Sequence, residues 1–273
     1  MGLVYALIAA GLSLIFGLME LVNFAHGEFL MVAMYVTFFA WSLAHLDPVV
    51  ALPLAALALA GLGWAVYHGI IRWVLGGPML AQVFATFGLA VLLRAGAQFV
   101  WGVDFRVVKD PWLAGRVSLG GVFVGLPQLA ASALALAAFV ALWWFLARTE
   151  TGLALMATAQ DRQAAALMGI DTQRMFALGW AIGSACVGVA GGLLAMFYYV
   201  FPEVGGVFAL IAYVTVALGG FGNVPATLLA GVLVGLVEVF AGLLISPAMK
   251  HAVVFLLYLA VVLWRPLGLF GRF

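Results

Sequence analysis

The sequence predicts an all-α, polytopic membrane helix bundle of about eight transmembrane helices, some of them broken. Hydrophobic residues make up 67% of the 273-residue chain and charged residues 8%, and the mean hydropathy is +1.26. Soluble domains contain roughly 45–50% apolar and about 25% charged residues. Several long stretches carry no charge, and a membrane crossing needs about 20 such residues. This composition excludes a water-soluble enzyme and a disordered chain.

The expected spans follow the stretches without Asp, Glu, Lys or Arg. They are residues 1–19, 29–46, 48–71, 73–93, the part of 117–147 after Pro127, 175–202 and 250–265. The uncharged run 204–237 is too long for one crossing. The glycines and the proline of 219–225 interrupt it, which predicts a short helix, a break and a longer helix ending near residue 245. The first segment has no basic flank, so we expect a span there and not a signal peptide.

Two polar loops separate the spans. Residues 102–120 combine charged residues with several valines, which predicts a loop with short β structure. Residues 148–174 form a polar loop rich in helix formers. Six basic residues are expected on the side of the membrane that carries the 148–174 loop and four on the opposite side. Cytoplasmic loops are enriched in Lys and Arg, so this count favours a cytoplasmic 148–174 loop. A difference of two residues does not decide the orientation. The six are Arg72, Arg148, Arg162, Arg174, Arg265 and Arg272.

Polar groups at three places stand out in so apolar a chain. Residues Asn23–Glu28 could form a short broken segment that lines a cavity, or an ordinary interhelical loop. Arg94 could extend to the membrane interface or pair with a buried carboxylate, and Glu238 could be its partner or a pathway residue. For Arg94 and Glu238 structural pairing is the simpler interpretation.

Small residues indicate close helix packing, and one short pattern recurs. Ser184, Gly188 and Gly192 have the small-xxx-small spacing that lets helices approach closely in lipid. The tetrapeptide of residues 6–9 recurs at 209–212, and each copy is followed by Phe-Gly and then Asn. Although such a match is close to chance in this composition, it would fit an internal repeat of the kind found in transporters.

No motif for catalysis, a cofactor or a metal is present in the sequence. Neither lysine follows a glycine, so there is no P-loop for ATP, and the four histidines are scattered. The single cysteine, Cys186, cannot form an internal disulfide. A net charge of +1 without a basic run argues against nucleic-acid binding. We therefore expect no enzyme, and we expect any pumping energy to come from another subunit.

Residues 158–171 encode a short capped helix inside the 148–174 loop. Asp161 is a good N-cap, strong helix formers follow, and Gly169 is a plausible left-handed C-cap with Ile170 packing back. Asp171 or Thr172 can cap the next helix. Such a short helix is unstable alone. It suits docking into a groove on a partner, although local sequence alone favours a surface connector.

Several motifs, in the same order along the chain, resemble one family of transporters. Ala164-Ala165-x-x-x-Gly169 resembles the E-A-A-x-x-x-G loop of ABC-importer permeases, with Gln163 in place of the glutamate. Four further segments resemble the branched-chain amino acid branch of these permeases, and the one with Asn-Phe-Ala-His-Gly-Glu is the most specific. They are residues 5–17, 22–29, 217–225 and 265–271. The chain is thereby identified as a member of the branched-chain amino acid permease family of ABC importers.

The resemblance implies a single transmembrane permease domain over 1–273, multi-pass in a bacterial inner membrane and in contact with lipid. It implies a homologous second permease as heterodimer partner, two cytoplasmic ATPase subunits and a periplasmic substrate-binding protein. The substrate would be a branched-chain or other small hydrophobic amino acid. Some members import urea, short amides or aromatic acids, and the motifs do not separate these. We expect few charged side chains along the translocation path. The two charges of a zwitterionic substrate would then be stabilised by backbone dipoles and polar side chains.

Two groups of residues are the candidate sites. The translocation pathway is assigned to two breaks that we expect to lie side by side across a pseudo-two-fold axis: Asn23, His26, Gly27 and Glu28, and Gly219, Gly220, Gly222 and Asn223. The ATPase-coupling helix is assigned to Asp161, Arg162, Ala164, Ala165, Gly169 and Ile170. A passive solute channel, which would not need the 161–170 helix, and a membrane scaffold, which would not explain Asn23–Glu28, are the alternatives.

Overall fold

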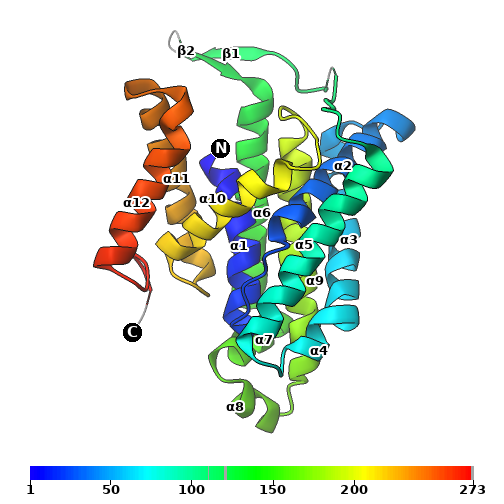
Figure 1. The fold of residues 1–273 in the computed structure, drawn as a ribbon, viewed down its shortest axis with the longest axis vertical. Helices are drawn as coiled ribbons and strands as arrows, with labels where there is room; N and C mark the ends of the chain where they lie inside the picture. Colours follow the sequence, from blue (N-terminus) through cyan, green and yellow to red (C-terminus); the bar gives the residue numbers. More distant parts are fainter. Residues whose placement is uncertain (110, 120–121, 272–273) are drawn as a thin grey trace.

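The computed structural model describes residues 1–109, 111–119 and 122–271, and within these ranges it is an all-α bundle (Figure 1). Eight helical stretches of the described residues are long and apolar enough to cross a membrane. They are α1 (Gly2–Met19), α2 (His26–Ala44), Pro48–Val74, α5 (Met79–Trp101), α6 (Leu126–Arg148), α9 (Thr172–Leu194), α11 (Val224–Leu244) and Pro247–Trp264. A shorter apolar helix, α10 (Val204–Gly219), lies between α9 and α11. The predicted fold class is confirmed.

Two of the long stretches are composite. Pro48–Val74 consists of α3 (Pro48–Val66), a π-helical segment η1 (Tyr67–Ile71) and α4 (Arg72–Val74). Pro247–Trp264 consists of a 3-10 turn η2 (Pro247–Met249) and α12 (Lys250–Trp264).

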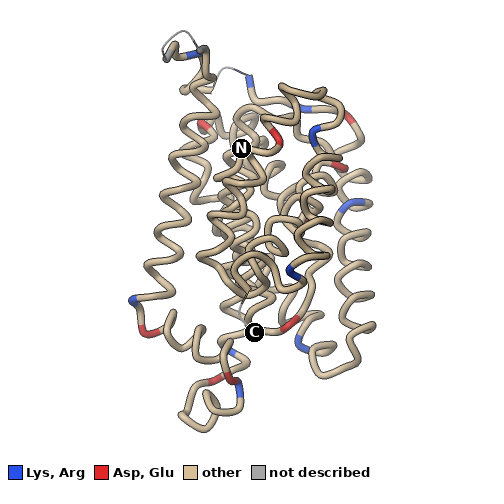
Figure 2. The backbone as a smooth tube through the Cα atoms, turned by 90° about the vertical axis from the view of Figure 1, so that its left-hand side faces the viewer, with Lys and Arg blue, Asp and Glu red and all other residues tan. Residues whose placement is uncertain are grey.

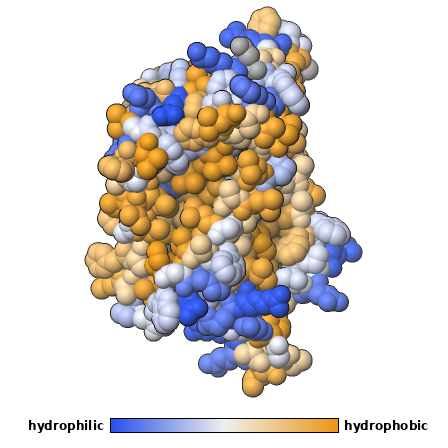
Figure 3. All heavy atoms as spheres, turned by 90° about the vertical axis from the view of Figure 1, so that its right-hand side faces the viewer, coloured by the Kyte–Doolittle hydropathy of each residue, from blue (hydrophilic) through white to orange (hydrophobic). Residues whose placement is uncertain are grey.

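Charged residues gather towards two ends of the bundle, with an apolar band between them (Figures 2 and 3). One end carries α7 (Glu150–Gln160) and α8 (Arg162–Leu167), and we call it the α8 end. The other carries an antiparallel hairpin of β1 (Arg116–Leu119) and β2 (Val122–Gly125), and we call it the hairpin end. The hairpin confirms the short β structure expected in the loop after α5. Arg272, which we expected on the same side of the membrane as the 148–174 loop, lies outside the described residues.

Helix α1 is the centre of the bundle, and small residues bring its neighbours close. Within its span 78% of residues are buried, against 11% for Pro247–Trp264. Gly231 of α11 abuts Ala6 of α1, so that a Cβ there would lie 2.6 Å from the Ala6 Cβ. Gly188 of α9 abuts Ala55 and Ala56 of α3 in the same way. The small-residue spacing thus does bring helices together, as predicted.

The fourth span differs from its prediction. We expected residues 73–93, but the preceding helical stretch continues to Val74, and α5 begins at Met79 after Pro78 and ends at Trp101. The charge on Arg94 misplaced the predicted end, because an arginine was read as the boundary of an apolar run. The helix tolerates it there because it has a buried partner, described below.

Candidate translocation site and coupling helix

The chain re-enters the bundle between α1 and α2. Helix α1 ends at Met19, and the left-handed φ of 54° at Glu20 turns the backbone, so that residues 20–25 are not helical. Asn23 closes a local turn by accepting a hydrogen bond from the Ala25 N–H at 3.1 Å. The His26 ring then lies 2.9 Å from the carbonyl oxygen of Ile8, midway along α1. Helix α2 therefore begins near half the depth of α1.

Side chains from other helices satisfy the backbone of this re-entrant segment. The Tyr213 hydroxyl of α10 donates to the Asn23 carbonyl at 2.5 Å. The Thr86 hydroxyl of α5 lies 3.3 Å from the Val22 carbonyl, and it shares its one proton between that oxygen and two carbonyls of its own helix at 3.1 Å. Irregular backbone at membrane depth requires such partners. The Asn23 side-chain amide Nδ2 is buried and has no hydrogen-bond partner among the described residues. The broken segment, and not the ordinary loop, is thus the interpretation that the geometry supports.

Gly27, which we assigned to the first break, is helical. It does not interrupt the helix, because His26, Gly27 and Glu28 form the first turn of α2. It permits a close crossing instead: a Cβ on Gly27 would collide with the Gly205 carbonyl and with Ala209 of α10. The non-helical residues are 20–25, upstream of the glycine.

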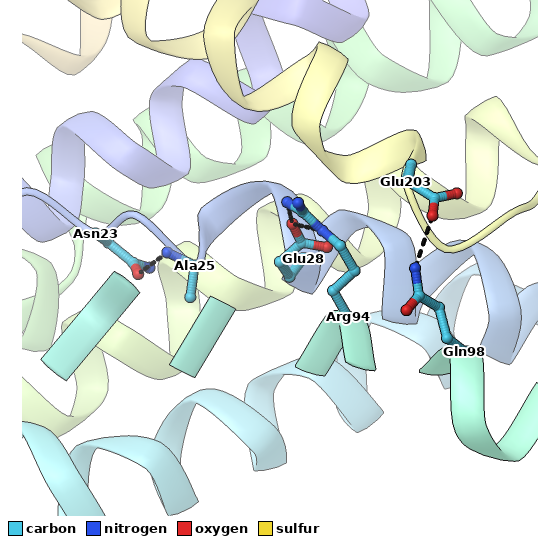
Figure 4. Close-up of polar contacts among 6 residues, drawn as sticks. All are labelled: Asn23, Ala25, Glu28, Arg94, Gln98 and Glu203. Carbon is cyan, nitrogen blue, oxygen red and sulfur yellow. Dashed lines mark hydrogen bonds and ion pairs between the residues drawn. The ribbon is translucent and has the colours of Figure 1, made fainter. Parts of the chain in front are cut away.

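Glu28 and Arg94 form an ion pair inside the bundle (Figure 4). Glu28 is 2% exposed, and its Oε1 accepts from Arg94 Nε at 3.1 Å and from Arg94 Nη2. The other carboxylate oxygen, Oε2, is buried without a partner among the described residues. Arg94 therefore pairs with a buried carboxylate, which was one of its two predicted roles.

A further polar link joins α5 to the start of α10, one turn beyond Arg94. The Gln98 amide donates to Glu203 Oε1 at 2.7 Å (Figure 4). Sequence reasoning missed Glu203, although it stands alone between the uncharged runs 175–202 and 204–237. Three charged side chains, Glu28, Arg94 and Glu203, therefore lie near the start of α2, more fixed charge than we expected there.

Glu238 belongs to a separate structural cluster. Its carboxylate accepts from the Tyr5 hydroxyl at 2.7 Å and pairs with Lys250 Nζ at 2.8 Å. These contacts tie α1, α11 and α12 together. The prediction of structural pairing is confirmed for Glu238, but its partner is Lys250 and not Arg94.

The glycine-rich break at 219–225 is a tight turn. Gly220 and Gly222 adopt left-handed φ values of 98° and 77°, which suit glycine because it has no Cβ. Asn223 begins α11 by accepting from the Ala226 N–H at 3.2 Å, and its amide donates to the Phe270 carbonyl at 3.2 Å. The predicted break is confirmed.

The two breaks do not lie side by side, and this expectation was wrong. Gly222 packs against Gly17 near the α8 end of α1, whereas His26 meets α1 at Ile8. The two contacts are nine residues apart, or about 13 Å along the helix. The turn instead borders an open groove at the α8 end. The groove is lined by Phe16, Gly17, Glu20, Met156, Ala159, Gln160, Phe221, Gly222, Asn223, Pro225 and Gly271.

Helix α8 has the caps that its sequence predicts, and it projects from the bundle (Figure 1). Asp161 Oδ1 accepts from the N–H groups of Gln163 and Ala164 at 2.8 and 2.9 Å. Gly169 takes a left-handed φ of 85°, and the Ile170 N–H donates to the Ala165 carbonyl at 3.1 Å, which is a Schellman ending. Asp171 caps α9. Within the helix Ala165 is buried, while Arg162 and Ala164 are exposed.

Two exposed apolar side chains at the end of α8 were missed in the sequence. Leu167 is 88% exposed and Met168 is 83% exposed. A signal was available, because these two residues are the only large apolar ones between Asp161 and Gly169. An apolar pair held out on a capped helix is a surface suited to a protein partner.

A polytopic bundle with charged side chains buried at depth, a re-entrant segment and a projecting capped helix defines a membrane transport protein. Comparison with known proteins makes the class more specific. The family model described as "Branched-chain amino acid transport system / permease component" matches residues 1–262. The chain belongs to this family of permease components of ABC importers.

Named relatives cover nearly the whole chain. The permease protein BraD of a high-affinity branched-chain amino acid transport system of Pseudomonas aeruginosa is 30% identical over 284 residues, which cover 99% of this chain and 92% of BraD. LivH of Escherichia coli strain K12 is 31% identical, covering 100% and 92%. A probable LivH of Methanocaldococcus jannaschii is 24% identical over 85% of this chain and 75% of its own. No solved structure matches. These matches favour a permease over a passive channel.

Proposed function

We propose that this chain is one of two transmembrane subunits of an ABC importer in a bacterial inner membrane, and that the importer carries branched-chain or other small hydrophobic amino acids. The family match over residues 1–262 carries the proposal. The names of BraD and LivH support the substrate class. Urea, short amides and aromatic acids are the competing substrates.

The expected partner subunits follow from the functions that an ABC importer needs and that this chain does not provide. This chain contains no P-loop, so ATP must be hydrolysed elsewhere, by two cytoplasmic ATPase subunits. A homologous second permease would complete the path, and a periplasmic binding protein would deliver the substrate at the hairpin end. In this arrangement 148–174 is the cytoplasmic loop and 1–273 is one permease domain.

Helix α8 is the element that would couple ATP hydrolysis to transport. Its Asp161 cap and its Gly169 ending define where the helix begins and ends. Its exposed surface includes Arg162, Ala164, Leu167 and Met168. We assign this surface to a groove on the ATPase, with Ala165 and Ile170 holding the helix in shape from the inner side.

The path would run beside the start of α2. Asn23, His26, Gly27 and Glu28 gather at half the depth of α1, where a solute has to pass between polar groups. Gly222 and Asn223 would border the cytoplasmic mouth, since they line the groove that opens at the α8 end. The buried Gly219 and Gly220 would shape the turn behind them.

Reconstitution of the purified importer tests the substrate. The complex of both permeases, the ATPases and the binding protein is placed in proteoliposomes, and ATP turnover is measured with leucine, isoleucine and valine and with urea, acetamide and benzoate. We expect the three branched-chain amino acids alone to raise ATP turnover and to be taken up. Stimulation only by one of the other solutes would contradict the substrate assignment.

A glycine pair tests the coupling helix. Gly169→Val places a β-branched residue at φ 85°, which costs about 1–2 kcal/mol and distorts the end of α8. Gly76→Val is the control, because Gly76 lies in a turn at the same end with open space around it and no positive φ. We expect Gly169→Val to lower uptake and substrate-stimulated ATP hydrolysis while membrane insertion stays normal. Equal uptake by both variants would contradict the coupling role.

A further inference from the structure

We propose that Arg94, Gln98 and Glu203 form a binding site for the charged end of an α-amino acid, and that Glu28 positions Arg94 within it. Arg94 would hold the carboxylate, and Glu203 would hold the ammonium group. This inference deepens the proposed function and rests on it.

The location of Arg94 is the first reason. It lies seven residues before the end of α5, roughly 10 Å inside the hairpin end of that helix. Its side chain is 41% exposed even though Glu28 holds it. An arginine facing lipid at this depth is costly, so the exposed part of the guanidinium must face water or protein. That surface is where a solute from the hairpin end would arrive.

The hydrogen bonds of Arg94 leave it able to bind an anion. Within the described part of the chain, its bonds run from Nε and Nη2 to the single oxygen Oε1 of Glu28. A guanidinium carries more donors than these, in a planar fork that matches a carboxylate. Glu28 thus fixes the orientation of the fork and leaves its outer edge free.

The negative partner lies one helical turn away. Arg94 and Gln98 are four residues apart on α5, or about 6 Å. Gln98 donates to Glu203 at 2.7 Å, which keeps this exposed carboxylate beside α5. An α-amino acid carries both charged groups on one carbon, so its binding site needs a cation and an anion near each other, and the Gln98 contact holds Glu203 beside α5 one turn from Arg94. The site then complements a zwitterion and discriminates against an uncharged amide or urea.

The surroundings suit an aliphatic side chain. Val91 of α5 and Val207 and Leu210 of α10 are exposed next to the charged residues along the same two helices. Val91 lies three residues before Arg94, and Val207 lies four residues after Glu203, so each shares a helix face with a charged residue. A branched aliphatic group would contact these side chains while its charged end reaches Arg94 and Glu203.

The test uses the complete importer with a reporter cysteine. Val207→Cys is introduced into a chain whose one cysteine, Cys186, is replaced by Ala, and maleimide labelling is followed with and without leucine. The comparison solutes are 4-methylpentanoate, which lacks the amino group, and 3-methylbutylamine, which lacks the carboxylate. We expect leucine to slow labelling and neither analogue to do so at the same concentration.

Glu203→Gln is the main variant, because Glu203 is exposed and its loss leaves the Glu28–Arg94 pair intact. We expect leucine protection to disappear and leucine uptake to fall about tenfold or more, as for a lost charged hydrogen bond. The double variant Glu28→Gln with Arg94→Gln removes the pair without leaving one charge buried, and we expect the same loss. Asp104→Asn, an exposed carboxylate in the loop after α5, is the control and should behave as wild type.

The outcomes separate this site from the proposed function. Wild-type uptake of leucine without protection of the reporter, or normal uptake by Glu203→Gln, contradicts the site and leaves the proposed function standing. A wild-type importer that takes up no branched-chain amino acid contradicts the proposed function and this site together. Protection by leucine that Glu203→Gln abolishes and Asp104→Asn retains supports the site.

Discussion

Two interruptions of the helical bundle can be compared directly: the re-entrant segment 20–25 between α1 and α2, and the turn 219–225 before α11. The turn contains three glycines and a proline, and Asn223 has both its amide nitrogen and its oxygen bonded. The re-entrant segment contains neither glycine nor proline. It nevertheless penetrates further, to the level of Ile8, and leaves the amide nitrogen of Asn23 without a partner in the described chain.

The difference shows that glycine and proline mark where a helix breaks but not how deep the break lies. Depth comes from partners on other helices. Tyr213 and Thr86 provide hydroxyls for the segment's carbonyls, and His26 reaches Ile8. A fully extended run of six residues would span about 20 Å. Residues 20–25 therefore return from the end of α1 towards its middle even though they include a turn. Buried polar atoms without partners are costly in structure and are therefore the atoms to examine for function.

The largest effect is expected at Gly27. Gly27→Val would place side-chain atoms against the Gly205 carbonyl and Ala209, and it should destabilise the bundle by about 3 kcal/mol or more. Gly96→Val is the control, because nothing lies within 4 Å of a Cβ at Gly96 on α5. Folded yield in membranes and thermal unfolding in detergent measure the difference. Equal stability of the two variants would mean that the α2–α10 crossing does not need a glycine.

The next effect is expected at His26, the contact that sets the depth of α2. His26→Ala removes a fully buried ring and its bond to the Ile8 carbonyl, which should cost about 2–3 kcal/mol. The control His45→Ala changes an exposed histidine at the other end of the same helix. Thermal unfolding and leucine uptake are compared. Unchanged stability and uptake in His26→Ala would mean that the segment is an ordinary loop without a role in transport.

A smaller effect is expected at the turn. Asn223→Leu loses the cap of α11 and the bond to Phe270, which should cost about 1–2 kcal/mol. Asn223→Ser keeps a capping oxygen and should recover part of that loss. Uptake per folded molecule should fall less than in Asn23→Leu, because Asn23 belongs to the path that we propose. A larger fall in uptake for Asn223→Leu than for Asn23→Leu would mean that the 219–225 turn matters more for transport than the re-entrant segment.

The smallest effect is expected at Thr86. Thr86→Val keeps the shape of the side chain and removes a hydroxyl whose proton the Val22 carbonyl shares with two carbonyls of α5, so the loss should be at most about 1 kcal/mol. Thr158→Val is the matched control, because the Thr158 hydroxyl bonds only within its own helix, to the Ala154 carbonyl. Hydrogen exchange of residues 20–25 should rise in Thr86→Val and not in the control. No change in either variant would show that Tyr213 alone satisfies the segment.

The sequence by itself determined the class of fold, most spans, the caps of α8 and the family. These properties depend on local composition and on short motifs: an uncharged run long enough to cross, an aspartate before helix formers, a glycine after them. The predicted end of the fourth span was wrong for the same local reason. The charge of Arg94 was taken as the end of an apolar run, because its partner Glu28 lies 66 residues away in the sequence.

Only the tertiary structure decided which polar groups meet. It paired Arg94 with Glu28, Gln98 with Glu203 and Lys250 with Glu238, and it placed the 219–225 turn against Gly17 and not beside Asn23. Each of these contacts joins residues from different helices. No local sequence pattern predicts these contacts. A charged residue in an apolar helix indicates that a polar partner is needed, but it does not indicate which residue that partner is. Which partner it finds depends on how small residues such as Gly27 and Gly205 let the helices cross.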